Sequence, residues 1–148
     1  MADTAANPPL RSAAADGPCY WIEYQVDSNC DGVLLGSDIF TECSDTEKIV
    51  ESQPLGELAT INLYYSTGCR AVSADLWLYG NPPSGTYCFV EILRSPYGKE
   101  YNAGYPGHGP GGIYSTPLLY NADTQAYARA YCNWGDEPEH YYAETGWW

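Results

Sequence analysis

Hydrophobic and polar positions alternate with a period of two over most of the chain after Ala59. This period is typical of half-buried β-strands, because an amphipathic helix repeats about every 3.6 residues instead. The expected strands cover 59–65, 70–79, 86–94 and 126–132, with two more around 113–120 and 140–148. Residues 46–52 fit either a strand or one helical turn, and 104–112 form a glycine-rich irregular loop. Short strands separated by Gly/Pro turns predict an all-β fold, a small antiparallel β-sandwich or barrel.

The chain has 148 residues, which is room for one domain. Residues 1–17 are rich in Ala, Pro, Asp and Ser, and Leu10 is their only large apolar side chain after Met1. Such a segment buries too little surface to become ordered alone. We therefore expect a flexible N-terminal arm over 1–17 and a single disulfide-stapled β domain over 18–148. The alternative is a docking arm that becomes ordered when Leu10 packs against a partner.

The cysteine pattern indicates disulfides rather than a metal site. The cysteines are Cys19, Cys30, Cys43, Cys69, Cys88 and Cys132, and no pair has C-x-x-C spacing. Many connectivities are possible, and we favour Cys19–Cys30, Cys43–Cys69 and Cys88–Cys132. The alternation motivates the last pair, because it places both cysteines in line with small or apolar inward residues. Free or metal-bound thiols are the alternative.

Three disulfides require an oxidising compartment, so we expect a secreted protein. The first residues lack the basic start and apolar core of a signal peptide. We therefore expect that a leader has been removed or that export takes another route. The net charge of −13 argues against binding to nucleic acid or to an anionic membrane surface. No apolar run is long enough for membrane insertion.

Residues 27–38 fit the spacing of a twelve-residue calcium loop. The candidate ligands are Asp27, Asn29, Asp31, the carbonyl of Val33, and Asp38. Gly32 at the sixth position permits the sharp turn that directs several oxygens at one hard cation. Calcium is the only cofactor that the sequence suggests. The alternative is an Asx-rich turn beside a disulfide.

Candidate catalytic residues are few. No serine lies in a G-x-S-x-G motif, and oxidised cysteines are not nucleophiles. A hydrolase would have to use His108 in the glycine-rich loop, or the acidic run Asp136–Glu139 beside His140. That run is typical of a solvated hairpin tip, whereas a catalytic carboxylate needs burial to shift its pKa. We therefore expect no enzymatic activity.

Aromatic residues are the best candidates for binding. Trp77 and Tyr79 lie opposite the apolar positions of their strand, and Tyr127 and Tyr131 do so on theirs. If the two strands share a sheet, its outer face carries Trp and Tyr, which are common interface anchors. The alternative is a second core beneath loops.

Several motifs resemble those of a known family. They are Asn62-Leu63-Tyr64-Tyr65-Ser66-Thr67-Gly68-Cys69-Arg70-Ala71, Cys30-Asp31-Gly32 followed by Asp38 and Cys43, Tyr114–Ala122, and Ala128-Arg129-Ala130. In these motifs the chain resembles the YjfA-like family, small secreted proteins of unknown function from Gram-positive bacteria, chiefly actinomycetes. The resemblance implies secretion, disulfides and a β-rich domain, and it brings no known activity. Cys88 is not a usual position of that family, which agrees with a separate Cys88–Cys132 pair.

The sequence thus predicts a secreted, non-enzymatic binding module. Its partner is expected to be another extracellular protein, bound by the aromatic face or by the N-terminal arm, which would make the chain a subunit or adaptor of an extracellular assembly. One alternative is a carbohydrate or cell-wall binding module that stacks Trp77, Tyr79 and Tyr127 on sugar rings, with calcium assisting. Another is an inhibitor of extracellular proteases that inserts the 104–112 loop into a cleft.

Overall fold

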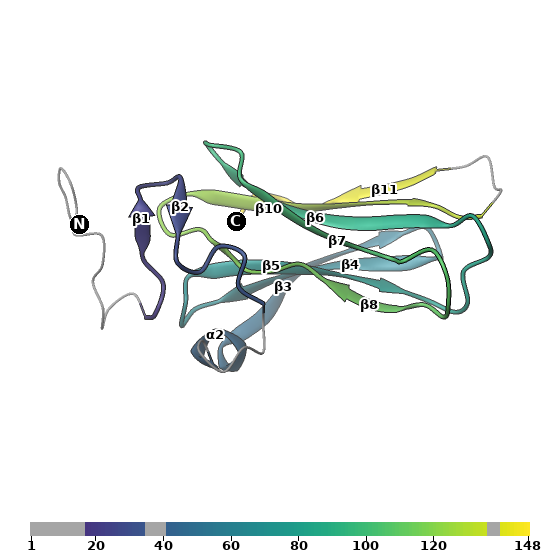
Figure 1. Ribbon diagram of the computed structural model, residues 1–148, viewed down its shortest axis with the longest axis horizontal. Helices are drawn as coiled ribbons and strands as arrows, with labels where there is room; N and C mark the ends of the chain where they lie inside the picture. The colour runs from purple at the N-terminus through teal and green to yellow at the C-terminus, as the bar shows by residue number, and fades with distance from the viewer. Residues whose placement is uncertain (1–16, 35–40, 136–139) are drawn as a thin grey trace.

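The computed structural model describes residues 17–34, 41–135 and 140–148. Several sequence predictions lie outside these residues: the arm up to residue 16 with Leu10, the ligand Asp38, and the acidic run Asp136–Glu139. In the described part, two antiparallel sheets form the two layers of a sandwich (Figure 1). The predicted all-β, disulfide-stapled sandwich is therefore confirmed.

The first sheet, called here the five-stranded sheet, has the order β3-β4-β5-β8, with β9 also paired to β5. Its strands are β3 (Glu47–Leu55), β4 (Ala59–Ser66), β5 (Ala71–Leu78), β8 (Gly112–Ser115) and β9 (Leu119–Tyr120). The four-stranded sheet has the order β11-β10-β6-β7. Its strands are β6 (Tyr87–Ser95), β7 (Glu100–Gly104), β10 (Gln125–Asn133) and β11 (His140–Glu144).

Alternation along β6 and β10 determines what lies between the sheets. In β6 the side chains of Cys88, Val90 and Ile92 are buried, and the residues between them are partly or fully exposed. In β10 every second residue from Ala126 to Cys132 is buried in the same way. Together with aliphatic residues of β4 and β5, these side chains form the sandwich core. The period of two in the sequence thus correctly identified the inward positions.

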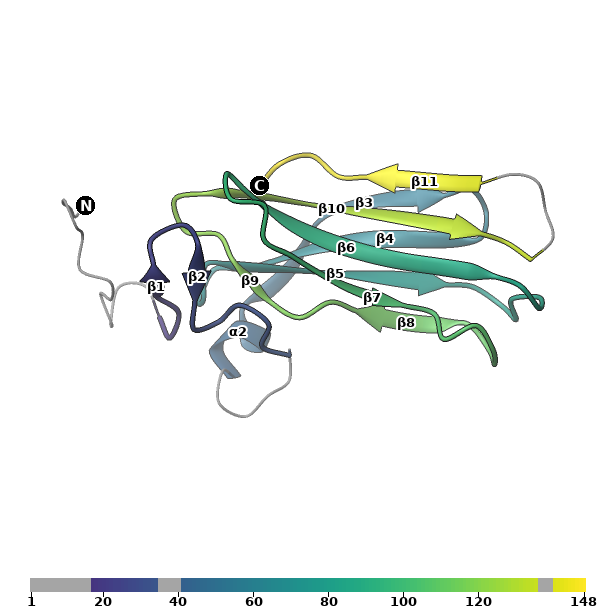
Figure 2. The same ribbon diagram turned by 45° about the horizontal axis from the view of Figure 1, so that its top comes forward.

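A second, smaller cluster closes one end of the sandwich, and we call it the end cap. It consists of Cys19, Trp21, Cys30, Cys43, Cys69, Ala71, Leu118, Tyr120 and Ala122. The short strands β1 (Trp21–Glu23) and β2 (Asp27–Ser28) and the one-turn helix α2 (Thr41–Asp45) bring its parts together. Both views show these elements toward the same end of the molecule (Figures 1 and 2). Within 17–34, 41–135 and 140–148, no helix has the length and apolar character of a membrane span.

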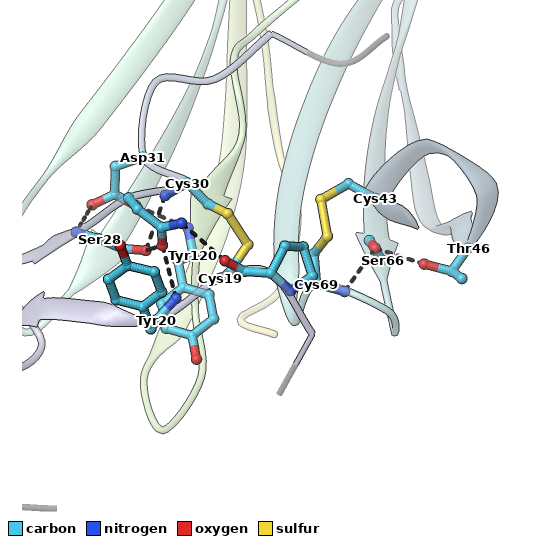
Figure 3. Close-up of a disulfide and its surroundings, with 12 residues drawn as sticks. Cys19, Tyr20, Ser28, Cys30, Asp31, Cys43, Thr46, Ser66, Cys69 and Tyr120 are labelled. Atoms are coloured by element: carbon cyan, nitrogen blue, oxygen red, sulfur yellow. Dashed lines mark hydrogen bonds between the residues drawn. A yellow bond between two sulfur atoms is a disulfide. The ribbon is translucent and has the colours of Figure 1, made fainter. Parts of the chain in front are cut away.

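All three favoured disulfides are present. Cys19–Cys30 and Cys43–Cys69 lie side by side in the end cap (Figure 3). Cys88–Cys132 instead joins residues that are direct partners on neighbouring strands of one sheet. The alternation argument for this last pair is therefore confirmed.

Two strand predictions need correction, and one open alternative is decided. The expected single strand over 113–120 is wrong, because it divides into β8 and β9. The hydroxyl of Thr116 accepts a hydrogen bond from the Ala74 amide between them, and Pro117 has no amide to donate. For 46–52 the strand alternative is confirmed, because β3 begins at Glu47 and pairs with β4 as far as Leu55. The strand expected over 140–148 ends at Glu144.

Candidate functional site

The four aromatic residues predicted to share one face lie on two different faces. Trp77 belongs to β5 of the five-stranded sheet and Tyr79 directly follows that strand, whereas Tyr127 and Tyr131 belong to β10 of the four-stranded sheet. All four point away from the buried positions of their strands, as expected. The prediction that they form one surface is nevertheless wrong, because the two sheets pack face to face and their outer faces point in opposite directions.

The outer face of the four-stranded sheet carries the larger group of rings. Tyr131 of β10 is in register with Phe89 of β6, and their ring centroids are 5.8 Å apart with a 31° angle between the planes. On the other side, Tyr131 lies against His140 of β11 at 5.7 Å and 22°. A 2.7 Å hydrogen bond joins the Tyr131 hydroxyl to Nδ1 of His140. Phe89, Tyr131 and His140 therefore form a strip of similarly oriented rings across three strands.

Tyr87 extends this strip at the start of β6. Its ring centroid lies 5.6 Å from that of Phe89 and 6.2 Å from that of Tyr131, and Tyr87 is 57% exposed. Phe89 faces Gly104 of β7, so no side chain from that strand covers the ring directly. We call Tyr87, Phe89, Tyr131 and His140 the aromatic platform. Tyr87 and His140 are exposed, whereas Phe89 and Tyr131 are half-buried. Rings that reach solvent together on a sheet face indicate a binding surface, since an outer face is normally polar.

Polar groups border the platform. Nε of Arg129 donates to Oε1 of Glu91 at 2.8 Å, and the Tyr142 hydroxyl donates to Oε2 of Glu144 at 2.7 Å. The hydrogen bond from Arg129 to Glu91 raises the pKa of the guanidinium, and the hydrogen bond to Glu144 raises the pKa of Tyr142. Tyr142 therefore keeps its proton at neutral pH. These groups can offer both donors and acceptors to a polar ligand.

The outer face of the five-stranded sheet is different. Its two exposed rings, Trp77 and Tyr79, meet edge-on at 6.0 Å and 67°, and the Tyr79 hydroxyl bonds to that of Thr60. The next positions along carry a buried polar pair, in which Nδ2 of Asn62 donates to Oδ1 of Asp75 at 2.9 Å. This face therefore offers one exposed pair of rings beside side chains that already bond to one another.

Tyr64 and Glu47 lie on the same side of the five-stranded sheet and have shifted pKa values. Burial and a hydrogen bond with Asp75 raise the pKa of Tyr64 well above its usual range. Burial, with the charge of Asp75 nearby, also raises the pKa of Glu47. One carboxylate oxygen of Glu47, Oε2, is buried with no hydrogen-bond partner, which is consistent with that shift.

The predicted calcium ligands have protein partners in this structure. Asp31 accepts two hydrogen bonds from the guanidinium of Arg94, each at 2.8 Å, and Asp27 accepts one from Nζ of Lys99 at 2.7 Å. The side-chain oxygen of Asn29 accepts from the Tyr20 amide. The Val33 carbonyl accepts from the Leu118 amide at 2.8 Å, and Asp38 lies outside the described residues. Calcium binding by this loop stays a prediction.

Arg94 is the residue that sequence reasoning missed most clearly. Its side chain is fully buried with that of Asp31, and it also donates to the carbonyls of Tyr120 and Val26. The guanidinium lies over the Trp21 ring, 4.8 Å from its centroid. A signal was present: the inward series Cys88, Val90 and Ile92 continues to Arg94, and a buried arginine requires an acidic partner.

The platform residues were also partly missed. Only Tyr131 was among the predicted binding residues, although Tyr87 and Phe89 occupy the outward positions between buried residues of β6. Their alternation was readable, and the favoured Cys88–Cys132 pair linked this strand to β10, but nothing in the sequence placed both strands in one sheet with β11. The other histidine, His108, is exposed in the loop between β7 and β8.

Comparison of the chain with protein-family models, with curated proteins and with solved structures finds no match. The functional residues are therefore assigned from the geometry of this chain alone.

Proposed function

We propose that this protein is an extracellular, non-enzymatic carbohydrate-binding module, and that its binding surface is the aromatic platform. The observation that carries the proposal is the strip of similarly oriented rings formed by Phe89, Tyr131 and His140, with exposed Tyr87 beside it. The C–H face of a sugar ring packs well on the face of an aromatic ring, since the latter carries partial negative charge. Rings in neighbouring strands provide such a surface without a deep pocket.

The polar border supports the same ligand. Sugar hydroxyls both donate and accept hydrogen bonds, and the platform is flanked by the carboxylates of Glu91 and Glu144, the guanidinium of Arg129 and the Tyr142 hydroxyl. The net charge of −13 repels anionic polymers. Neutral glycans are therefore the preferred class.

An extracellular setting is supported by the three disulfides, which are characteristic of oxidising compartments. The resemblance to the YjfA-like family supports it as well. The proposed contacts are made by the platform and the polar groups beside it, so the calcium loop is not part of this proposal.

A glycan array tests the proposal directly. The wild-type protein and a Tyr131→Ala variant are applied to neutral glucans, xylans, mannans and chitin oligosaccharides, with heparin and alginate as anionic comparisons. We expect neutral glycans to bind and Tyr131→Ala to lose at least about tenfold in affinity, which corresponds to one stacking contact or more. Trp77→Ala is the matched control, because it removes a half-exposed ring from the opposite sheet.

The outcomes are distinct. If Trp77→Ala abolishes binding and Tyr131→Ala does not, the site lies on the other face and the proposal is wrong. If no glycan binds, the carbohydrate function is overturned. The remaining hypothesis is then that the platform binds another extracellular protein, as the sequence predicted.

A further inference from the structure

A second aromatic pair lies on the same face as the platform. Tyr127 of β10 and Trp147 have ring centroids 4.4 Å apart, and Trp147 is 51% exposed. Tyr127 and Tyr131 are four residues apart on one strand and point to the same side. At about 3.3 Å per residue, the pair lies about 13 Å from the platform along β10.

Backbone hydrogen bonds hold Trp147 in place. Beyond β11 the chain stays beside β10, where the Thr145 amide donates to the Ala128 carbonyl at 2.9 Å. Trp148 and Ala126 then exchange two backbone hydrogen bonds, each at 2.8 Å. Trp147 is therefore fixed between two paired residues, so little conformational entropy is lost when a ligand packs on it.

Hydrogen-bonding groups occupy the interval between the two aromatic groups. Arg129 lies between Tyr127 and Tyr131 on the same side of β10, and it is in register with Glu91 on one neighbouring strand and with Glu144 on the other. Its Nη1 also lies 3.5 Å from the Tyr127 hydroxyl oxygen. The face thus carries an aromatic group, a polar centre and a second aromatic group in a line along one strand.

We infer that the ligand is an internal stretch of a linear, neutral polysaccharide that lies along β10 and contacts both aromatic groups at once. This inference rests on the proposed function and adds the length and direction of the ligand. A terminal sugar would fill only the platform and would leave Tyr127 and Trp147 without a role. A linear chain can cover both groups, place hydroxyls against Arg129 and its carboxylate neighbours, and continue past each end of the open sheet face.

Calorimetry with a length series tests the inference. The probes are oligosaccharides of whichever neutral polymer the array identifies, from the disaccharide to the hexasaccharide. We expect affinity to rise at least tenfold in one step, at the length that first spans both aromatic groups. Trp147→Ala should lower the affinity for the hexasaccharide to that for the disaccharide. Tyr131→Ala should instead weaken binding at every length. Trp77→Ala should change neither the affinities nor the length at which they rise.

Trp147→Phe protects the test against loss of folding. It keeps an aromatic ring at the same place in the backbone, so it should retain most of the rise in affinity with oligosaccharide length. If wild-type affinity is the same at every length, or if Trp147→Ala leaves the step intact, the inference is overturned while the proposed function stands. If neither short nor long oligosaccharides bind, the proposed function itself fails.

Discussion

The sandwich core and the end cap are stabilised by different means. The sandwich core is mainly aliphatic, with residues such as Ile61, Leu76 and Ile92 completely buried between two sheets. The end cap contains four cysteines among nine buried residues, and beside it lies the fully buried ion pair of Arg94 and Asp31. A small cluster buries too little apolar surface to hold its segments alone. Covalent and ionic links therefore replace apolar burial at this end of the molecule.

The comparison also explains why a charge is tolerated in one region and not in the other. At the end of β6, four hydrogen bonds from Arg94 reach Asp31 and two backbone carbonyls. Of these partners, Tyr120 belongs to the end cap, Asp31 directly follows its Cys30, and Val26 lies between β1 and β2. Between the sheets, the side chains of Val90 and Ile92 belong to the buried apolar core. The same strand thus changes from apolar to ionic packing within two residues.

The largest expected effect comes from Arg94→Met. This change leaves the buried Asp31 carboxylate without its cation, and we expect a loss of about 3–5 kcal/mol in the free energy of unfolding. Denaturant unfolding at neutral pH measures it. Arg129→Met is the control, because it breaks a partly exposed ion pair with Glu91 and should cost about 1 kcal/mol or less. Equal losses in the two variants would show that the end cap does not depend on this pair.

Leu76→Ala tests the sandwich core. Leu76 is completely buried, so its truncation leaves a cavity between the sheets and should cost about 3 kcal/mol. Leu34→Ala removes the same atoms from a side chain that is 65% exposed, and should cost almost nothing. Thermal and denaturant unfolding give both values. A small cost for Leu76→Ala would mean that the apolar core contributes less than the cross-links.

Cys43→Ser separates the two kinds of disulfide. The sulfurs of Cys19, Cys43 and Cys69 lie within 4.8 Å of one another. We expect a loss of about 2 kcal/mol from the missing bridge. In addition, the freed Cys69 thiolate can attack the Sγ of Cys19, forming Cys19–Cys69 and releasing Cys30 as a thiolate.

Peptide mapping by mass spectrometry after alkylation detects this exchange. Cys88→Ser is the control: Cys132 lies in the sandwich core, away from the end-cap disulfides, so the other two bridges should stay intact. Retention of Cys19–Cys30 in every molecule of the Cys43→Ser variant would contradict the expected exchange.

The smallest effects concern pH, and they have opposite signs at Asp27 in β2 and at Glu47 on the outer side of the five-stranded sheet. The hydrogen bond from Lys99 lowers the pKa of Asp27 below 3.8, so Asp27 contributes stability above that pH and loses it as pH falls through the lowered value. Burial raises the pKa of Glu47 above 4.5, so Glu47 contributes stability below that pH and loses it as pH rises. Each effect should stay below about 1 kcal/mol, since both groups are partly solvated.

Two variants check these signs in denaturant unfolding between pH 3 and pH 7. Asp27→Asn should destabilise the protein at pH 7 and have progressively less effect toward pH 3. Glu47→Gln should stabilise it at pH 7 and have little effect at pH 4. His108→Ala, in an exposed loop, serves as the control. The same sign for both variants at pH 7 would contradict the assignments.

The sequence alone determined which side of each strand is buried. Cys88, Val90 and Ile92 on one side and Tyr87 and Phe89 on the other follow from the period of two, since neighbouring side chains of a strand point to opposite faces. The same period put Cys88 and Cys132 inward and supported their pairing. It also placed Arg94 inward, although its partner Asp31 is 63 positions away in the chain.

Only the tertiary structure decided which strands lie together. Alternation gives the face of a residue but carries no information about the strand beside it, because backbone hydrogen bonds between strands are the same for any pair. Trp77 and Tyr131 therefore had equivalent patterns in the sequence and lie on opposite sides of the molecule. The aromatic platform exists because β6, β10 and β11 became neighbours, and that choice depends on how the whole chain buries its apolar surface.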